Sequence, residues 1–315
     1  MNHLSNISNQ ILSGNRVAIA RGISMVENEH QNSRLLLEEI YHKTGVAYRI
    51  GITGPPGAGK STITNKLAAA YRKQGLKVGV IAVDPTSPFT GGALLGDRVR
   101  MTDIDLDEGV FIRSMASRGS LGGLSKKAIE AADILDAAGF DIILMETVGV
   151  GQSELDIAGA TDTTIVVLVP ESGDSIQAMK AGLMEIADFF VLNKSDRAGA
   201  DQAVMSIKMI LNFKTKKDGW QPDVIQTVAS EGKGIDKIEE TISHHRKYLE
   251  DSSGLKGKRQ KRMVNRIHEL VKEKLHIEFW NEAREKYLLL NIENVIRKDS
   301  TPYDLAEKLL QDFTK

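Results

Sequence analysis

A glycine-rich stretch in the first quarter of the chain carries the residue types that bind phosphate. It consists of Gly54, Pro55, Pro56, Gly57, Ala58, Gly59, Lys60, Ser61 and Thr62. The spacing matches G-x-x-x-x-G-K-[ST], in which glycines let backbone N–H groups turn toward an anion without a Cβ atom in the way. In this pattern the lysine reaches the β- and γ-phosphates and the hydroxyl binds Mg²⁺, so Lys60 and Ser61 take these roles. The stretch, called the phosphate loop below, therefore predicts a nucleoside triphosphate site.

The flanking sequence favours this interpretation over a turn that contains a lysine by chance. Residues 48–53 have the character of a buried strand, and Ile63, Leu67 and Ala70 continue past the loop at helical spacing. The motif requires this strand–loop–helix context. The first turn of the helix adds unpaired N–H groups and the positive end of the helix dipole. We expect the phosphates to lie at this helix N-terminus.

Glu146 directly follows a predicted strand and is the main candidate for the metal site. The strand covers residues 142–145, and Gly149 comes three residues after the glutamate. In nucleotide switches a carboxylate at this position orients a metal-bound water, and the glycine N–H contacts the γ-phosphate. We therefore predict catalytic roles for Lys60, Glu146 and Gly149, and metal binding by Ser61 and Glu146.

Two aspartates are further candidates for the metal site, each with an ordinary alternative. Asp84 follows the predicted strand 78–83 and can face Mg²⁺ or its waters, but it can equally be a turn residue before Pro85. Asp97 lies in a glycine-containing segment that suits a loop ordered by a phosphate–metal centre, or it forms a solvated charge pair with Arg98. The residues alone leave both alternatives open.

An N-K-x-D sequence after the predicted strand 189–192 indicates which base is bound. Its members are Asn193, Lys194 and Asp196. The Asp196 carboxylate can accept hydrogen bonds from guanine N1–H and from the exocyclic amine, whereas adenine lacks both donors and leaves the carboxylate unpaired. After the predicted strand 224–227, Val228 and Ala229 complete the base site, with the Ala229 N–H offered to guanine O6. The sequence therefore predicts GTP and GDP as ligands.

The residue after Gly149 indicates how fast hydrolysis runs. Ras-type switches place a glutamine there to orient the attacking water, but this chain has Val150, and the nearest glutamine is Gln152. We expect slow GTP hydrolysis unless a partner supplies or repositions a group.

Alternating strands and helices from residue 46 to about 240 predict an α/β fold, a mostly parallel sheet with helices on both faces. We expect three parts: an N-terminal helical extension over 1–45, a nucleotide-binding domain over 46–245 and a C-terminal helical arm over 246–315. The predicted strands are 48–53, 78–83, 110–112, 142–145, 164–169, 189–192 and 224–227. In such sheets ligands bind at the carboxyl ends of the strands, where the motif residues occur.

The two helical ends are expected to pack rather than to catalyse. In the N-terminal part, an apolar stripe formed by Val17, Ala20, Ile23 and Val26 is predicted to face the core. The C-terminal arm carries surplus apolar residues, which favours dimerisation over packing on the core. Its last helix should begin at Pro302, after Thr301. The basic run at 256–262 is interpreted as a solvated face.

Composition restricts the class of protein. The formal net charge of the 315 residues is −1, so no global field attracts nucleic acid or anionic lipid. The chain has no cysteine, which excludes disulfides and thiolate metal sites. The N-terminus lacks the apolar core of a signal peptide, and no run approaches the length of a membrane span. We expect a soluble cytoplasmic protein without a nucleic-acid or membrane partner.

Taken together, these motifs resemble the MeaB/ArgK family of GTPases, which act as chaperones for cobalamin-dependent acyl-CoA mutases and include the methylmalonic aciduria type A protein. The resemblance rests on residues 54–62, 84–88, 96–101, 112–125, 146–154 and 193–196. Residues 113–125 and 146–154 are nearly diagnostic. The guanine site departs from the family's common Ser-Ala ending, because Val228 occupies the serine position.

The resemblance implies a P-loop NTPase fold and Mg²⁺-dependent GTP hydrolysis that gates cofactor loading and protects an adenosylcobalamin-dependent mutase such as methylmalonyl-CoA mutase. It implies that Asp84, Asp97 and Glu146 surround the Mg²⁺. It also implies that residues 171–180, with Asp174 and Lys180, form a switch that contacts the mutase, and that the C-terminal arm joins a homodimer.

Two other function classes stay open at this point. Relatives of the family carry the label of arginine/ornithine transport kinases, but a kinase needs an acceptor pocket with a base, and the motifs show none. A metallochaperone for another metal usually carries clustered His or Cys. This chain offers only His244 and His245 as neighbours, which we expect to be solvated surface residues of a polar helix.

Overall fold

The structure is a computed structural model that describes residues 2–84, 104, 106–116, 126–147, 153–170, 182–214 and 219–311. It divides into two compact units, Met1–Lys256 and Gly257–Lys315. The boundaries that we predicted for three parts stay predictions.

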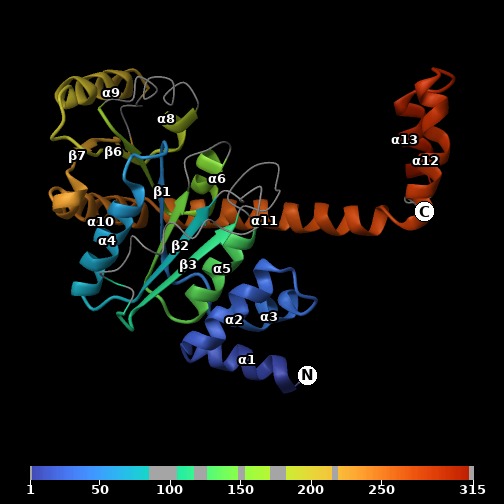
Figure 1. Cartoon of the computed structure of the whole chain (residues 1–315), viewed down its shortest axis with the longest axis horizontal. Coiled ribbons are helices and arrows are strands. Elements are labelled where there is room, and N and C mark those ends of the chain that lie inside the picture. Colours follow the sequence, from blue (N-terminus) through green and yellow to red (C-terminus); the bar gives the residue numbers. More distant parts are fainter. Residues whose placement is uncertain are drawn as a thin grey trace. The chain divides into compact units, whose positions relative to one another are not determined.

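The first unit holds a sheet, the helices that cover it and a helical N-terminal layer (Figure 1). Its strands are β1 (Tyr48–Thr53), β2 (Val78–Asp84), β3 (Val110–Ala116), β4 (Ile142–Thr147), β5 (Thr163–Leu168), β6 (Phe189–Leu192) and β7 (Val224–Gln226). Its α-helices are α1 (Asn2–Leu12), α2 (Arg16–Glu27), α3 (Ser33–Ile40), α4 (Lys60–Lys73), α5 (Lys126–Ala137), α6 (Ser153–Ala160), α8 (Met184–Ile186), α9 (Ala200–Lys214) and α10 (Ile235–Asp251). The residues described in this unit also form the short 3₁₀ helices η1 (Tyr41–Lys43) and η4 (Ala229–Glu231).

Over the described residues, the strands form one seven-stranded sheet in the order β3-β2-β4-β1-β5-β6-β7, and every neighbouring pair is parallel. This confirms the predicted fold class and all seven strands, with β3 and β4 extending further than predicted. The central strand β1 has β4 on one side and β5 on the other, so the chain order changes direction there. Ligands bind at the carboxyl ends of strands at such a switch point.

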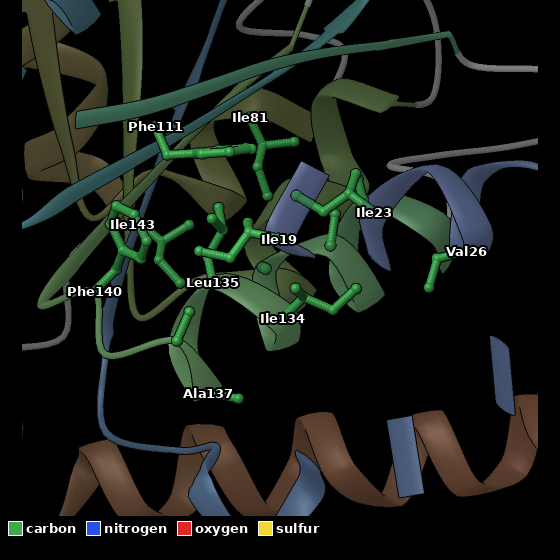
Figure 2. Packing of buried hydrophobic residues seen from close by; sticks show 14 of the residues in the cluster. Ile19, Ile23, Val26, Ile81, Phe111, Ile134, Leu135, Ala137, Phe140 and Ile143 are labelled. Atoms are coloured by element: carbon green, nitrogen blue, oxygen red, sulfur yellow. The ribbon is translucent and has the colours of Figure 1, made fainter. Parts of the chain in front are cut away.

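Both faces of the sheet are buried, because alternate side chains of each strand point to opposite faces. On β4, Ile142 and Leu144 pack with α4 and α10, whereas Ile143 and Met145 pack with α5 and the N-terminal helices. On the second face, Ile19 and Ile23 of α2 lie beside residues of α5, with Ile81 and Phe111 of the sheet above them (Figure 2). The N-terminal helices are therefore part of the core.

The predicted stripe on α2 is wrong at its first position. Val17 is 70% exposed, while Ile19, Gly22, Ile23 and Val26 are buried. Gly22 belongs to the packed face because a Cβ atom there would lie 2.8 Å from Ile11 Cδ1. Glycine has no side chain, so a pattern of apolar residues does not include it. The predicted face of α2 was therefore displaced from the buried one.

The amino edge of the sheet, opposite the phosphate loop, is fixed by buried polar groups. Asp136 accepts hydrogen bonds from the backbone N–H groups of residues 45–47 and from the Arg49 guanidinium, which also pairs with Asp133 at 2.7 Å. Burying charge is costly unless it is paired and hydrogen-bonded, as it is here. This network anchors the start of β1, the strand that leads to the phosphate loop.

A second buried network at the same edge corrects the expectation for one histidine. His245 is 1% exposed, and its Nδ1 lies 2.7 Å from the Thr163 hydroxyl, which also bonds the Tyr48 hydroxyl at 2.6 Å. Its Nε2 lies 3.3 Å from Asp188. His244 is exposed, as predicted. The two neighbours differ because adjacent residues on a helix point about 100° apart, and only His245 faces the sheet.

In the C-terminal part, α11 (Gly254–Phe279) is followed by α12 (Glu282–Ile296) and α13 (Pro302–Leu310). Thr301 and Asp304 form a reciprocal capping box with Pro302 at the first helical position, which confirms the predicted start. Apolar side chains on α11, among them Ile267 and Leu270, are 51% and 42% exposed. None of the helices described combines the length and apolar character needed to cross a membrane.

Candidate functional site

The phosphate loop leaves the carboxyl end of β1 and enters α4, as the motif predicts. Gly54 has φ of 133°, and a Cβ atom there would lie 2.1 Å from the Val167 carbonyl oxygen. Gly59 has φ of 91°, and its Cβ atom would lie 2.2 Å from Asn193 Nδ2. Both positions therefore require glycine, for backbone conformation and for space.

Lys60 begins α4 and is only 6% exposed. Its ammonium group donates to the carbonyl oxygens of Gly54 at 2.7 Å and Pro55 at 3.0 Å. The cation is thus folded back inside the loop, at the N-terminal end of the helix. A buried ammonium at a helix N-terminus is a strong attractor for phosphate oxygens.

Glu146 lies at the end of β4, beside β1, and is buried. Its Oε1 accepts a hydrogen bond from the Ser61 hydroxyl at 2.6 Å, and its Oε2 accepts one from the Thr64 hydroxyl at 2.9 Å. The predicted pair Ser61–Glu146 is therefore brought together. A hydroxyl and a carboxylate in contact are the hard oxygen donors that Mg²⁺ prefers, so the residues fit this ion.

Asn193 connects the predicted base site to the phosphate loop. Its Nδ2 donates to the Ala58 carbonyl at 2.8 Å, and its Oδ1 accepts from the Ala229 N–H at 3.0 Å and the Thr227 hydroxyl at 3.1 Å. Lys194, at φ of 56°, donates from Nζ to the Gly57 carbonyl at 2.8 Å. The two loops are thus joined at two points.

The remaining base-site residues lie on the same edge of the sheet. Asp196 is exposed, so its carboxylate is accessible to a base. Val228 pairs through its backbone with Lys233, which closes the turn that contains η4. The Ala229 N–H, predicted to bind guanine O6, is directed at Asn193 Oδ1 here. Its role toward O6 stays a prediction.

In the phosphate loop, Pro56, Gly57 and Thr62 are exposed, Pro55 is half-buried and Ala58 is buried.

Several other predicted residues lie outside the described part. Asp84 ends β2 opposite Ala116, but its side chain is not described. Asp97, Gly149, Val150 and residues 171–180 are also outside the described residues. Their roles stay predictions.

Thr64 is the contact to Glu146 that the sequence analysis did not identify. It is fully buried, three residues after Ser61 on α4. Residues three apart on a helix share a face, so the hydroxyl at this spacing was the signal that could have found it.

Among the residues that the structure describes, no group of three or more His, Asp or Glu side chains gathers as a metal site, and the predicted Asp84 and Asp97 contribute no described side chain.

Comparisons with known proteins agree with this geometry. Residues 19–284 match the family model described as methylmalonyl-CoA mutase-associated GTPase MeaB. A Pyrococcus abyssi protein described as a GTPase is 49% identical over 303 residues, covering 95% of this chain and 94% of the relative. The Mus musculus methylmalonic aciduria type A homolog, described as mitochondrial, is 33% identical over 96% of this chain and 78% of its own length.

A solved structure shows the same fold. The crystal structure of an LAO/AO transport system kinase aligns with a TM-score of 0.75 at 30% identity, over 100% of this chain and 99% of the other. These matches cover nearly the whole chain, and the observed phosphate loop and Ser61–Glu146 contact agree with them. The chain belongs to the MeaB family of methylmalonyl-CoA mutase-associated GTPases, a family of P-loop GTPases.

Proposed function

We propose that this GTPase binds Mg²⁺–GTP between the phosphate loop and the N-K-x-D loop, hydrolyses it slowly alone, and uses the nucleotide state to control an adenosylcobalamin-dependent mutase. The observation that carries the nucleotide part is the side chain of Asn193, which joins the two loops through Ala58 and Ala229. This contact places the N-K-x-D loop beside the phosphate loop, as a single nucleotide bound by both loops would require.

In this proposal each group of residues binds one part of the Mg²⁺–GTP ligand. The loop N–H groups and Lys60 hold the phosphates, because the ammonium exchanges its two loop carbonyls for phosphate oxygens. Ser61 and Glu146 hold Mg²⁺ or its waters, together with Asp84 and Asp97. When bound, Mg²⁺ neutralises charge that develops on the transferred phosphoryl group. Asp196 selects guanine, and Gly149 contacts the γ-phosphate.

The mutase part rests on the family. The matching family model names methylmalonyl-CoA mutase as the associated enzyme, and the mouse relative is named after methylmalonic aciduria. We propose that a mutase of this class is the partner, that the GTPase gates cofactor loading and protects the mutase, and that this happens in the cytoplasm. Residues 171–180, with Asp174 and Lys180, are the proposed contact.

We further propose a homodimer joined through the C-terminal arm. Ile267 and Leu270 of α11 are about half exposed, as are Val271 and Leu275 further along the same helix. A stripe of apolar side chains on one helix favours a helical partner. Light scattering should give twice the chain mass, and a doubly substituted Ile267→Asp, Leu270→Asp protein should be monomeric. A monomeric unsubstituted chain would refute this part.

The nucleotide proposal is tested with Lys60→Ala. Losing one electrostatic contact to the transferred group should lower kcat for GTP by about 10²–10³-fold. Lys73→Ala, at the exposed end of the same helix, is the matched control and should leave kcat unchanged. Normal GTP hydrolysis by Lys60→Ala would refute the assignment of the phosphate loop.

The kinase name of the LAO/AO structure supplies a competing hypothesis. A kinase associated with arginine and ornithine transport would transfer phosphate to a protein or to a small molecule, with these amino acids as the small molecules to test, whereas the proposed GTPase releases inorganic phosphate. Incubation with labelled GTP and these amino acids therefore distinguishes the two. The proposal expects phosphate release at a rate that neither amino acid alters.

A further inference from the structure

The Thr64 hydroxyl occupies a fixed position on α4. Its Oγ1 lies 2.9 Å from the Lys60 carbonyl oxygen, one turn earlier in the helix, and 2.9 Å from Glu146 Oε2. A threonine that bonds the carbonyl four residues back has its χ1 angle set by the helix. The single O–H proton is shared between the Lys60 carbonyl oxygen and Glu146 Oε2, so the backbone of α4 positions the hydroxyl beside the carboxylate.

Glu146 is held at both carboxylate oxygens. Ser61 donates to Oε1 and Thr64 donates to Oε2, and both donors come from the first turn and a half of one helix. Glutamate has one more rotatable bond than aspartate, the commoner residue at this switch position. The contact from Thr64 to Oε2 restricts rotation about that extra bond while Ser61 holds Oε1.

The two contacts differ in their relation to the proposed metal site. Ser61 is a proposed metal ligand, so its hydroxyl would serve both the ion and Glu146, and its position would depend on whether Mg²⁺ is bound. Thr64 is fully buried, and its side chain bonds the helix and Glu146, so its contact is available with and without the metal. Thr64 is thus one contact that holds the carboxylate in place independently of the proposed metal ligand Ser61.

We propose that Thr64 is a positioning residue for the metal site: it holds Oε2 of Glu146 so that Oε1 faces the Mg²⁺ and its waters. This inference rests on the proposed function, because it takes Ser61 and Glu146 as the metal site. It assigns to Thr64 a specific effect on Mg²⁺ affinity, which a residue that only fills the core would not have.

The test measures binding rather than turnover. The affinity for a fluorescent GDP analogue is determined in EDTA and over a range of free Mg²⁺ concentrations. Thr64→Val keeps the shape of the side chain and removes the hydroxyl, whereas Thr64→Ser keeps the hydroxyl. Ser61→Ala removes the proposed ligand itself. Thermal unfolding is followed for each protein, and Thr64→Ala serves as a second variant if the valine protein does not fold.

We expect Thr64→Val to raise the Mg²⁺ concentration for half-maximal effect about tenfold, as for the loss of a hydrogen bond to a charged group. Affinity in EDTA should stay within about twofold, and Thr64→Ser should restore the Mg²⁺ dependence. An unchanged Mg²⁺ dependence in Thr64→Val, with a shift in Ser61→Ala, would overturn this inference alone. Equal loss of affinity with and without Mg²⁺ would also overturn it, as a purely structural effect. No shift in either variant would instead refute the proposed metal site.

Discussion

The carboxamide of Asn193 donates a hydrogen bond to the carbonyl of Ala58 at 2.8 Å, so one side chain joins the loop after β6 to the phosphate loop. Its oxygen accepts from Ala229 on the loop after β7. Three loops at the carboxyl edge of the sheet therefore share one buried amide. This arrangement explains why a single residue of the base motif is expected to influence phosphate binding.

Asn193→Ala should lower both stability and nucleotide affinity. The substitution leaves the buried Ala229 N–H and the Thr227 hydroxyl without the acceptor that they use here. A buried group left unpaired costs about 1–3 kcal/mol, so we expect the free energy of unfolding to fall by about 2–4 kcal/mol in urea titrations. GDP affinity should fall at least tenfold, because the substitution also removes the hydrogen bond that joins the base loop to the phosphate loop. Asn291→Ala, whose amide bonds within α12, is the control. Unchanged GDP affinity in Asn193→Ala would contradict the linking role.

The sequence was sufficient to predict the edge of the sheet on which these residues meet. Each motif directly followed an apolar run of strand length, and parallel strands bring their carboxyl ends together. The contact between Asn193 and Ala58 could not be predicted in the same way, because it depends on φ at Gly59 and on side-chain rotamers. Thr64 differs: because Ser61 and Glu146 were predicted to share the metal site, the hydroxyl three residues after Ser61 was a usable signal, but its approach to Oε2 comes only from the structure.

Asp196→Asn should change which base is bound. An amide in place of the carboxylate presents a donor to the guanine amine, which needs an acceptor, so GDP affinity should fall about 100-fold. Xanthine carries a carbonyl at that position, which an amide N–H can bind, so xanthosine diphosphate should bind the variant better than GDP. Calorimetric titration measures both. Asp201→Asn, a nearby carboxylate on α9, should leave GDP binding unchanged. A variant that still prefers GDP would show that Asp196 does not read the base.

Two glycines of the phosphate loop should respond differently to alanine. Gly57 has φ of 74° but open space for a Cβ atom, so Gly57→Ala should cost about 1–2 kcal/mol of backbone strain. In Gly54→Ala the new Cβ would also collide with the Val167 carbonyl, which adds about 1–3 kcal/mol or more. Thermal unfolding should therefore rank Gly54→Ala as the less stable protein. The reverse order would mean that the loop does not pack on β5 as described.

Alkaline pH should destabilise the protein through buried tyrosines. Burial raises the pKa of Tyr48 and of Tyr71 above the usual value. Above the unfolded-state pKa of about 10, the unfolded chain binds fewer protons than the native one, so stability falls as pH rises. Each buried tyrosine contributes a slope of at most about 1.36 kcal/mol per pH unit, which is reached when the unfolded-state tyrosine is ionised and the native one is still protonated. Urea titrations from pH 9 to 11 should show a shallower fall in Tyr48→Phe and in Tyr71→Phe. An unchanged slope in both variants would contradict this assignment.

Burial of polar residues was the property that the sequence predicted least well. His244 and His245 are chemically identical neighbours, yet only His245 is enclosed, between Thr163, Asp188 and the ring of Trp220 at 4.7 Å. Its partners come from β5, from the start of β6 and from the segment before β7, so no local pattern marks the position. The burial of Gly22 on α2 was also not predictable from a local pattern, because the close packing there depends on the absence of a side chain.

Coupling between GTP hydrolysis and the mutase is measured by steady-state nucleotide hydrolysis with and without purified methylmalonyl-CoA mutase, with ATP in parallel. We predict slow hydrolysis of GTP by the protein alone, acceleration when the mutase is added, and no significant hydrolysis of ATP under either condition. GTP hydrolysis that the mutase leaves unchanged would contradict the proposed coupling while leaving the nucleotide site intact. Hydrolysis of ATP as fast as GTP would contradict the base-reading role of Asp196 and with it the account of the site.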